Sequence, residues 1–250
     1  MHARQCLAWR WSATASRAGR CVSNLRDDSL GRGLSPTRKK LDGLLTYQAF
    51  LATIHTIAFC DQDSVEWHGG IEEYGFWGIG IDDPVWITAF ESARVHLSPF
   101  LYPGYQRAPH ITIVPCGLLD SSHFSETRRQ RQLASLTEAR METFSLHVGP
   151  LDSFASTPYI SVIDPTGALD IIRELLQQTI REDNLGKYVP YLTLRHYRDT
   201  FETVVVADHL KKITMNPTKP LVVKELLFCA YKTKESQGPF EILERVKLSD

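Results

Sequence analysis

Cysteine is sparse and scattered in this 250-residue sequence, and no two cysteines form a CxxC pair. The five cysteines therefore support neither a zinc knuckle nor a disulfide framework, and a reducing compartment is the simplest expectation. No apolar run approaches the roughly 20 residues that a membrane-spanning helix needs, so we expect no membrane partner. The sequence also lacks a GxSxG elbow and a GxGxxG loop, the signals of a serine hydrolase and of a dinucleotide-binding fold.

Net charge is almost absent, but the charges are unevenly distributed. The formal net charge is −1, whereas residues 1–40 contain nine Lys or Arg against only Asp27 and Asp28. This segment is rich in Arg, Ser and Ala and has no apolar stretch like that of a secretory signal, a composition typical of mitochondrial transit peptides. We nevertheless expect residues 1–40 to be a basic, disordered leader. The predicted location is therefore cytoplasmic, and a mitochondrial location is the alternative.

Residues 41–250 are expected to form one bilobal domain, because 43% hydrophobic and 23% charged residues are ordinary values for a globular protein of this length. Apolar spacing and turn residues indicate a mixed series of helices and strands. The helices are expected at 44–60, 84–100, 127–141, 166–181 and 203–212, and the strands at 74–81, 110–116, 144–148, 159–163, 189–197, 221–231 and 240–248. This order predicts an α+β fold of two pseudo-symmetric lobes, whose antiparallel-rich sheets form a central cleft with helices on the outside.

One five-residue phrase occurs twice. Residues 109–113 read PHITI and residues 190–194 read PYLTL, so the two phrases begin 81 residues apart (190 − 109). Alternation along a strand puts His110 and Thr112 on one face and the aliphatic residues on the other. The same argument puts Tyr191 and Thr193 together. Two such strands facing each other would make a symmetric site for a phosphate.

These residue types suit the hydrolysis of a cyclic phosphodiester. The reaction needs a base that takes a proton from water, an acid that protonates the leaving oxygen, and donors for the phosphoryl oxygens. An imidazole serves proton transfer because its ordinary pKa of about 6.5 makes both forms accessible near neutrality. The hydroxyls of Thr112 and Thr193 would supply donors. The histidines show no metal-ligand spacing, so we predict neither a metal nor another cofactor.

The sequence resembles the 2H phosphoesterases, a family that includes RNA 2′,3′-cyclic phosphodiesterases and 2′-5′ RNA ligase-like proteins. The residues that carry the resemblance are 105–113 (YQRAPHITI), Cys116-Gly117, 151–154 (LDSF) and 188–194 (YVPYLTL). Members have two His-x-Thr/Ser motifs, one in each lobe, across a cleft. By this resemblance His110 and Thr112 match the first motif completely. Thr193 matches the hydroxyl of the second, and Tyr191 stands in the place of its histidine.

Tyr191 therefore separates two hypotheses. A phenol with an ordinary pKa of about 10 stays protonated at neutral pH, so it donates a proton or a hydrogen bond but is a poor base. In the first hypothesis the protein hydrolyses 2′,3′-cyclic phosphate ends of RNA or nucleotides, with His110 as the base and Tyr191 as the acid or an oxygen donor, at reduced activity. In the second, the protein is a catalytically degenerate module that binds a nucleotide or an RNA terminus. We expect a monomer in either case.

Two nearby residues extend the second motif. Arg195 shares a face with Tyr191 and Thr193 by strand parity and is a candidate for bidentate phosphate binding, although an exposed charge at a strand end is the alternative. His196 lies five residues beyond Tyr191 and invites the idea that it replaces the missing histidine. Parity opposes this, since residue 196 should point to the other face unless a bulge intervenes.

Overall fold

The computed structural model describes residues 46–60, 63, 65–178, 188–215 and 219–249. Within them, eight strands form one antiparallel sheet in the order β6-β3-β4-β5-β2-β1-β7-β8. The strands are β1 (Glu73–Gly80), β2 (His110–Leu118), β3 (Phe144–Ser153), β4 (Pro158–Ile163), β5 (Tyr191–Thr193), β6 (Leu221–Val223), β7 (Glu225–Lys232) and β8 (Phe240–Lys247). The helices are α2 (Val65–His68), α3 (Pro84–Leu97), α4 (Glu126–Ala139), α5 (Ala168–Gln177) and α6 (Thr203–Lys211).

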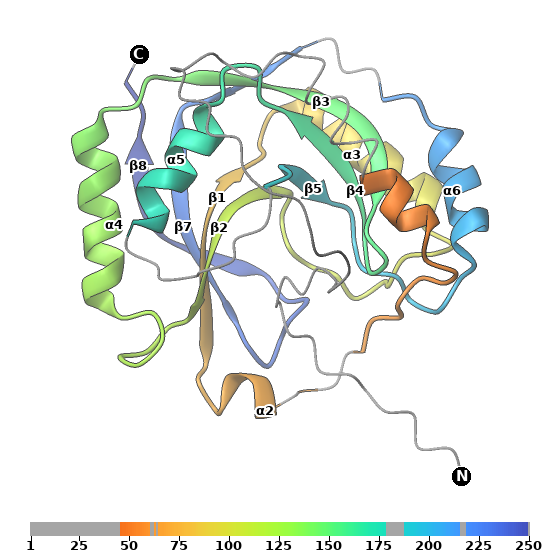
Figure 1. Ribbon diagram of the computed structural model, residues 1–250, viewed down its shortest axis with the longest axis horizontal. Helices are drawn as coiled ribbons and strands as arrows, with labels where there is room; N and C mark the ends of the chain where they lie inside the picture. Colours follow the sequence, from red (N-terminus) through yellow and green to blue (C-terminus); the bar gives the residue numbers. More distant parts are fainter. Residues whose placement is uncertain (1–45, 61–62, 64, 179–187, 216–218, 250) are drawn as a thin grey trace, which may run out of the picture.

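The sheet consists of two similar halves that meet at β2 and β5. One half contains the unit β1-α3-β2 and the other the unit β4-α5-β5, and in each unit the two strands lie side by side. Figure 1 shows the sheet curling strongly, with α4 and α5 beside one end and α3 and α6 beside the other. The expected α+β fold with two related halves and outer helices is therefore confirmed. The two halves share one continuous sheet because β2 and β5 pair directly.

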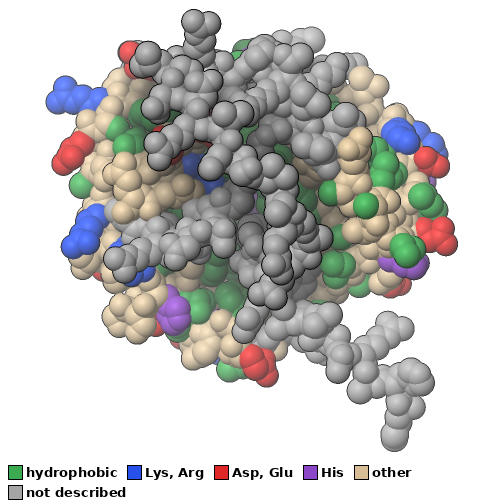
Figure 2. Space-filling view, in the orientation of Figure 1, with side chains coloured by type: hydrophobic (Ala, Val, Ile, Leu, Met, Phe, Trp, Pro, Cys, Tyr) green, Lys and Arg blue, Asp and Glu red, His purple; other side chains and the backbone are tan. Residues whose placement is uncertain are grey.

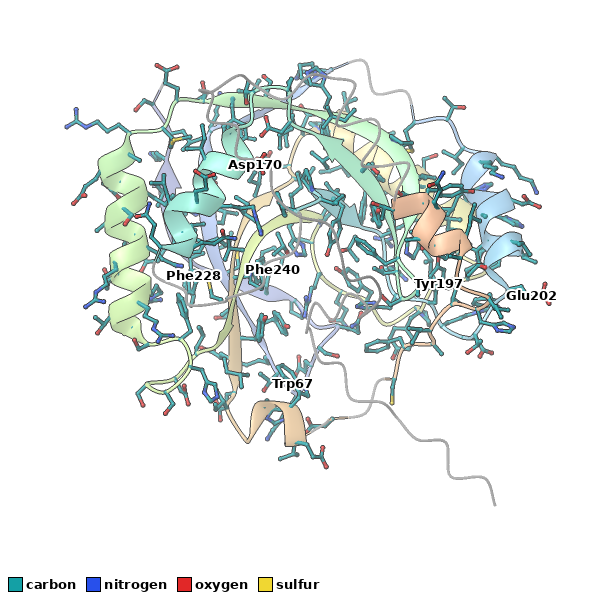
Figure 3. All side chains as sticks on the ribbon, viewed as in Figure 1. Trp67, Asp170, Tyr197, Glu202, Phe228 and Phe240 are labelled. Carbon is teal, nitrogen blue, oxygen red and sulfur yellow. The ribbon has the colours of Figure 1, made fainter. Side chains whose placement is uncertain are left out.

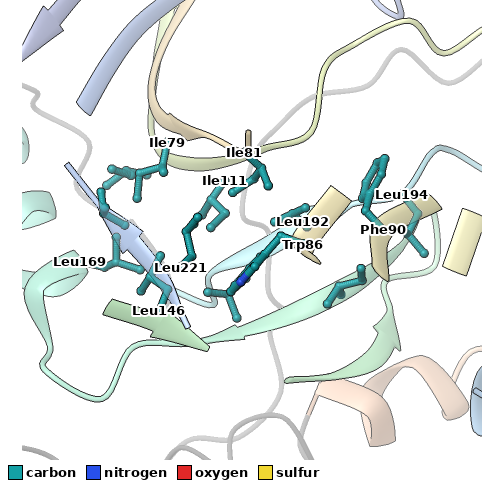
Figure 4. Packing of buried hydrophobic residues seen from close by; sticks show 14 of the residues in the cluster. Ile79, Ile81, Trp86, Phe90, Ile111, Leu146, Leu169, Leu192, Leu194 and Leu221 are labelled. Carbon is teal, nitrogen blue, oxygen red and sulfur yellow. The ribbon is translucent and has the colours of Figure 1, made fainter. Parts of the chain in front are cut away.

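A single large core fills the space between the sheet and the helices. Apolar residues at helical spacing on α3, including Trp86 and Phe90, are buried against strand residues of both halves, such as Ile111 and Leu192. Figure 4 shows this packing from close by. Because the two halves contribute to the same core, the pairing of β2 with β5 is stabilised by apolar burial as well as by hydrogen bonds.

A buried glutamine connects the sheet with two helices. Gln132 of α4 is 0% exposed, and its Oε1 accepts a hydrogen bond of 2.7 Å from Nε1 of Trp77 in β1. Its Nε2 donates to the main-chain oxygen of Leu176 in α5 at 2.9 Å. Both ends of the amide are thus satisfied, as a polar group in a core requires.

Two expected elements differ from the structure because loops interrupt them. The helix expected over 44–60 ends at Leu51, where the chain turns and the main chain of Thr56 pairs with Phe201 instead. The strand expected over 221–231 is two strands broken at Lys224. Its first part, β6, is at one end of the sheet, and its second part, β7, pairs with β1 near the other end. A continuous apolar run does not reveal that its two parts pair with different neighbours.

The second motif strand is much shorter than expected. Residues 189–197 were predicted as one strand, but β5 covers only Tyr191–Thr193. Beyond it the chain still follows β4, since the main-chain N–H of Leu194 donates to the oxygen of Pro158. The segment between residue 60 and β1, for which the sequence predicted no helix, contains the four-residue α2.

The outer surface is polar over one helix and partly apolar over another. Figure 2 shows Lys and Arg side chains over α4 at the left, and hydrophobic side chains over α6 at the right, where Val204 and Val205 are exposed. No helix in the described part of the chain is both long and apolar enough to cross a membrane.

Candidate functional site

The repeated phrases are neighbours in the sheet. Ile111 pairs with Leu192 in the antiparallel register of β2 and β5, and both side chains are buried in the core. Strand alternation then turns the residues on either side of each to the opposite face, where all four are half-buried. This face, which we call the inner face, carries His110, Thr112, Tyr191 and Thr193. The arrangement is close to two-fold symmetric about the Ile111–Leu192 pair.

His110 is held in one tautomer. Its Nδ1 lies 2.9 Å from the main-chain oxygen of Ala108, and because a carbonyl only accepts, Nδ1 carries the proton. Its Nε2 then holds the lone pair in the neutral ring. The centroid of the imidazole lies 5.2 Å from that of the Phe76 ring and 5.0 Å from that of the Phe240 ring. Phe240 is labelled in Figure 3. Burial lowers the pKa of His110 to about 4, with the Arg107 charge as a smaller cause, so the unliganded imidazole is neutral at pH 7.

Tyr191 lies in an aromatic environment in the other half. The ring of Phe154 meets the ring of Tyr191 edge-on, with the centroids 5.2 Å apart. The centroid of the Tyr159 ring lies 5.0 Å from that of Tyr191. Burial raises the pKa of Tyr191 to about 12, with the nearby Tyr105 phenol as a smaller cause. The hydroxyl is therefore protonated throughout the neutral range. It can donate a hydrogen bond or a proton, and it cannot act as a base there.

Glycines of β1 lie opposite the first motif. Gly80 is paired with His110 and Gly78 with Thr112, so neither paired position carries a side chain. The ring of Phe76, from the same strand, packs against the ring of His110 and lies 3.3 Å from where a Cβ at Gly78 would be. The close packing of the strands enforces glycine at Gly78, because a Cβ there would lie 2.8 Å from the main-chain oxygen of Ile111.

Arg195 binds the protein itself. Its Nη1 donates to the main-chain oxygens of Pro103 at 3.0 Å and of Tyr102 at 3.4 Å. Since β5 ends at Thr193, strand parity does not determine the direction of residue 195. The guanidinium thus fastens the loop that leads into β2, and a phosphate contact from Arg195 stays a prediction.

His196 packs among aromatic rings. It stacks on Phe59 with the centroids 5.1 Å apart and the planes 12° from parallel, and it meets Tyr105 edge-on at 6.3 Å. Burial lowers its pKa to about 4, and the charge of Arg107 acts in the same direction.

Arg107 is a cation at this site that the sequence pattern did not predict. Its guanidinium lies 3.7 Å from the ring centroid of Tyr231, and its Nη2 donates to the main-chain oxygen of Ser236 at 2.6 Å. Its charge also contributes to the lowered pKa of His110 and of His196. The only signal in the sequence was its position three residues before His110, within the segment that carries the family resemblance.

A second arginine, also missed, supports the first motif strand from the core side. Arg173 of α5 is buried and donates through Nη1 to the main-chain oxygen of Ile113. Its guanidinium lies 4.1 Å from the ring centroid of Tyr188, whose hydroxyl donates to the oxygen of Thr112 at 2.8 Å. The carbonyls of Thr112 and Ile113 follow Ile111, the residue at which β2 pairs with the short β5. The two side chains therefore satisfy strand groups that β5 does not reach.

A buried carboxyl completes the inner face in the second half. Asp152 pairs with Tyr159 between β3 and β4, and Tyr159 pairs with Thr193 between β4 and β5. Asp152 is 3% exposed, and burial raises the pKa of its carboxyl to about 6. The LDSF segment, residues 151–154, is thus separated from the second motif on β5 by one strand, β4.

No group of three or more His, Cys, Asp or Glu side chains is placed to hold a metal ion in the described ranges. A surface pocket of about 410 Å³ is lined by residues 51–55 and 202–204, which include none of the motif residues. The motif residues instead lie on the inner face of the sheet.

Comparisons with known proteins give the following matches. A family model described as the 2′-5′ RNA ligase superfamily matches residues 81–235. Among solved structures, E. coli LigT with phosphate is 13% identical with a TM-score of 0.49, covering 72% of this chain and 100% of that one. E. coli LigT with 3′-AMP is 15% identical (TM-score 0.47; 72% and 99% covered), and TT0787 of Thermus thermophilus is 11% identical (0.44; 70% and 97%). The comparison with curated protein sequences gives no match.

Proposed function

The chain belongs to the 2′-5′ RNA ligase superfamily, and we propose that it hydrolyses 2′,3′-cyclic phosphate ends of RNA or nucleotides without a metal ion. One observation carries this proposal: the pairing of Ile111 with Leu192 turns His110 and Tyr191 to the same face of adjacent strands. A phosphate on that face would have an imidazole on one side and a phenol on the other.

His110 is the proposed base. Its Nδ1–H is committed to Ala108, so Nε2 is the atom that takes the proton from the attacking water. A base with a pKa of about 4 is weak at neutral pH. A bound phosphate anion next to the ring favours the imidazolium and raises that pKa, so His110 becomes a stronger base when substrate is present.

Tyr191 is the proposed acid. The water oxygen forms a new bond to phosphorus, and the bond from phosphorus to one ribose oxygen breaks. The phenol proton of Tyr191 goes to that leaving oxygen, while His110 holds the proton taken from water. The hydroxyls of Thr112 and Thr193 donate to the non-bridging oxygens as negative charge develops there. Proton return from His110 to Tyr191 through solvent restores the starting state, and the product is a phosphate monoester.

The second candidate is a binding module without turnover. The observation that favours it is the phenol itself, since burial raises the pKa of Tyr191 to about 12 and makes its proton hard to give up. Loss of a general acid or base costs roughly 10²–10⁴-fold in rate. In this version the same four side chains hold the phosphate of a nucleotide or an RNA terminus.

Turnover of a nucleoside 2′,3′-cyclic phosphate in the presence of a chelator separates the two candidates. We expect the wild type to produce a monoester and His110→Ala to abolish turnover. Tyr191→His should raise the rate or move its pH optimum. An inert wild type together with an active Tyr191→His variant would establish the binding module instead.

For the whole protein we propose a cytoplasmic monomer, with mitochondrial import through the basic segment 1–40 as the alternative. That segment lies outside the described residues. A fluorescent fusion of the full chain compared with one that lacks residues 1–40 tests the location, and light scattering of the purified chain tests the monomer.

A further inference from the structure

The two motif strands pair over a very short length. β5 has three residues, and Ile111 with Leu192 is the one pair that joins β2 to β5 in register within the described ranges. Antiparallel pairing sets Thr112 opposite Tyr191, beside that pair. One pair fixes the register but resists twisting and splaying poorly. The distance between Thr112 and Tyr191 therefore depends on contacts outside the strand pairing.

A phenol of the second motif segment makes one such contact. The hydroxyl of Tyr188, three residues before Tyr191 in the sequence, donates to the main-chain oxygen of Thr112 at 2.8 Å. The ring is half-buried against the core. Burial raises the pKa of Tyr188 above its ordinary value, more strongly than the charge of Arg173 lowers it, so the hydroxyl keeps the proton that it donates. Tyr188 therefore ties the second motif segment to the first motif strand.

A buried arginine holds Tyr188 and β2 together. Arg173 is 8% exposed, and its guanidinium carbon lies 4.1 Å from the ring centroid of Tyr188. Its Nη1 donates to the main-chain oxygen of Ile113, the residue after Thr112. A charged donor makes a stronger hydrogen bond than a neutral one, and a desolvated cation over an aromatic ring adds attraction. Arg173 belongs to α5, whose apolar side is buried, so this support is anchored in the core.

Two successive carbonyls of β2 are thus held by side chains from the second half of the sheet. The oxygen of Thr112 belongs to the peptide group that follows Thr112, so holding it restricts the ψ angle of Thr112 and with it the direction of the Cα–Cβ bond. On the other edge of β2, Gly78 of β1 pairs with Thr112. The residue that carries the hydroxyl is therefore held from both edges. A misplacement of about 1 Å in a group of this kind costs roughly 10²-fold in rate.

We propose that Tyr188 is a positioning residue, which acts by holding the hydroxyl of Thr112 where that hydroxyl donates to a phosphoryl oxygen. Arg173 in turn keeps the ring of Tyr188 in place. This role rests on the proposed function, in which Thr112 is a donor. Tyr188 acts through Thr112 and not on the ligand, because its hydroxyl proton is committed to a main-chain oxygen.

Tyr188→Phe removes the hydroxyl and keeps the ring. We expect kcat for a nucleoside 2′,3′-cyclic phosphate to fall about 10-fold, less than the roughly 10²–10³-fold loss that follows when such a donor is removed outright. KM should stay within about 2-fold, because the donor acts mainly as charge develops in the transition state. The matched control is Tyr197→Phe, which removes another buried phenol hydroxyl, one that lies 2.6 Å from Oγ of Ser153 in β3. It should leave kcat within about 2-fold.

A double-mutant cycle with Thr112→Val separates positioning from stability. If Tyr188 acts through the Thr112 hydroxyl, Tyr188→Phe should change kcat by less than about 2-fold once that hydroxyl is absent. A merely structural role would lower kcat by the same factor in both backgrounds. Such equal factors would overturn the proposal, and so would an unchanged kcat in Tyr188→Phe.

Binding of a nucleoside 3′-phosphate, a product analogue, separates this proposal from the proposed function. If the wild type hydrolyses no cyclic phosphate, the same cycle is measured as affinity for this ligand. Tyr188→Phe should then weaken binding about 3-fold, within the contribution of one hydrogen bond, and only when Thr112 is present. That result would retain the positioning role and refute turnover alone. A wild type that neither turns over nor binds, or an affinity that is independent of both residues, would refute both.

Discussion

Ile111 and Leu192 face each other across the β2–β5 pair, and both side chains are buried. Each is the central residue of one copy of the repeated phrase. Because their burial fixes the register, it also fixes which side chains appear on the inner face. A slip of one residue in either strand would bury its motif side chains and expose aliphatic ones. The core contact therefore determines the geometry of the proposed reaction site.

The pH dependence of kcat/KM should report His110 on its acid side. The free protein has a His110 pKa of about 4 and a Tyr191 pKa of about 12, so we expect a broad plateau of kcat/KM through the neutral range.

Tyr191→Phe should reduce kcat by about 10²–10⁴-fold, because the leaving oxygen loses its acid. Tyr191→His should replace the plateau by a bell, with a descending limb near neutrality. Stopped assays with a nucleoside 2′,3′-cyclic phosphate between pH 4 and 10 measure this, and an unchanged rate in Tyr191→Phe would contradict the assignment.

Protein stability should fall on the acid side because of two half-buried histidines whose pKa values are lowered. Burial lowers the pKa of His110 and of His196 to about 4, below the ordinary value of about 6.5 in the unfolded chain. Their contribution is complete above pH 6.5 and is lost as the pH falls toward 4, since only the unfolded chain takes up the protons in that window. Urea unfolding at several pH values should show a shallower decline for His110→Gln and for His196→Gln than for the wild type. Identical slopes in all three proteins would refute the prediction.

Two glycines of β1 should respond differently to alanine. A Cβ at Gly78 would lie 2.8 Å from the main-chain oxygen of Ile111, which cannot move without disturbing β2. We expect Gly78→Ala to lower the free energy of unfolding by about 1–3 kcal/mol, as overpacking does. At Gly80 the nearest contact is Cδ1 of Leu227 at 3.1 Å, the end of a flexible side chain. Gly80→Ala is therefore the matched control, with an expected cost below about 1 kcal/mol. Equal losses in denaturant unfolding would rule out the steric explanation.

The buried amide of Gln132 should be important for stability. Gln132→Leu leaves Nε1 of Trp77 without its hydrogen-bond acceptor in the core and removes the hydrogen bond to the oxygen of Leu176. An unsatisfied buried donor costs about 1–3 kcal/mol, so we expect a loss of about 1–3 kcal/mol in thermal or urea unfolding. Gln130→Leu on the same helix is the control, because Gln130 is exposed and its side chain donates to the Glu126 side chain at the surface. Its effect should stay within about 0.5 kcal/mol, and a similar effect of the two substitutions would count against the network.

The sequence predicted the strand faces of the motif residues, because a local pattern was sufficient for that. Alternation in the repeated phrases determined which side chains share a face, and the repeat itself indicated two related halves. The structure agrees with both, since the phrases are adjacent strands with His110 and Tyr191 on one face. Prediction failed where the pairing partners of a strand determine its bounds and its place in the sheet. Residues 221–231 form two strands at different places in the sheet because Lys224 separates segments with different neighbours.

The arginines show the same limit. Arg195 was selected by parity, but β5 ends at Thr193, and the side chain holds a loop. Arg107 was not selected, because its position above Tyr231 depends on β7, more than a hundred residues away in the sequence. Arg173 likewise supports β2 from α5.

By itself the amino-acid sequence determined the chemical identity and the spacing of the motif residues, because alternation in a strand is a property of neighbouring residues. Tertiary structure alone decided their protonation and their surroundings. The pKa values of His110 and Tyr191 are shifted by burial, and burial comes from segments that the fold brings together from distant parts of the chain.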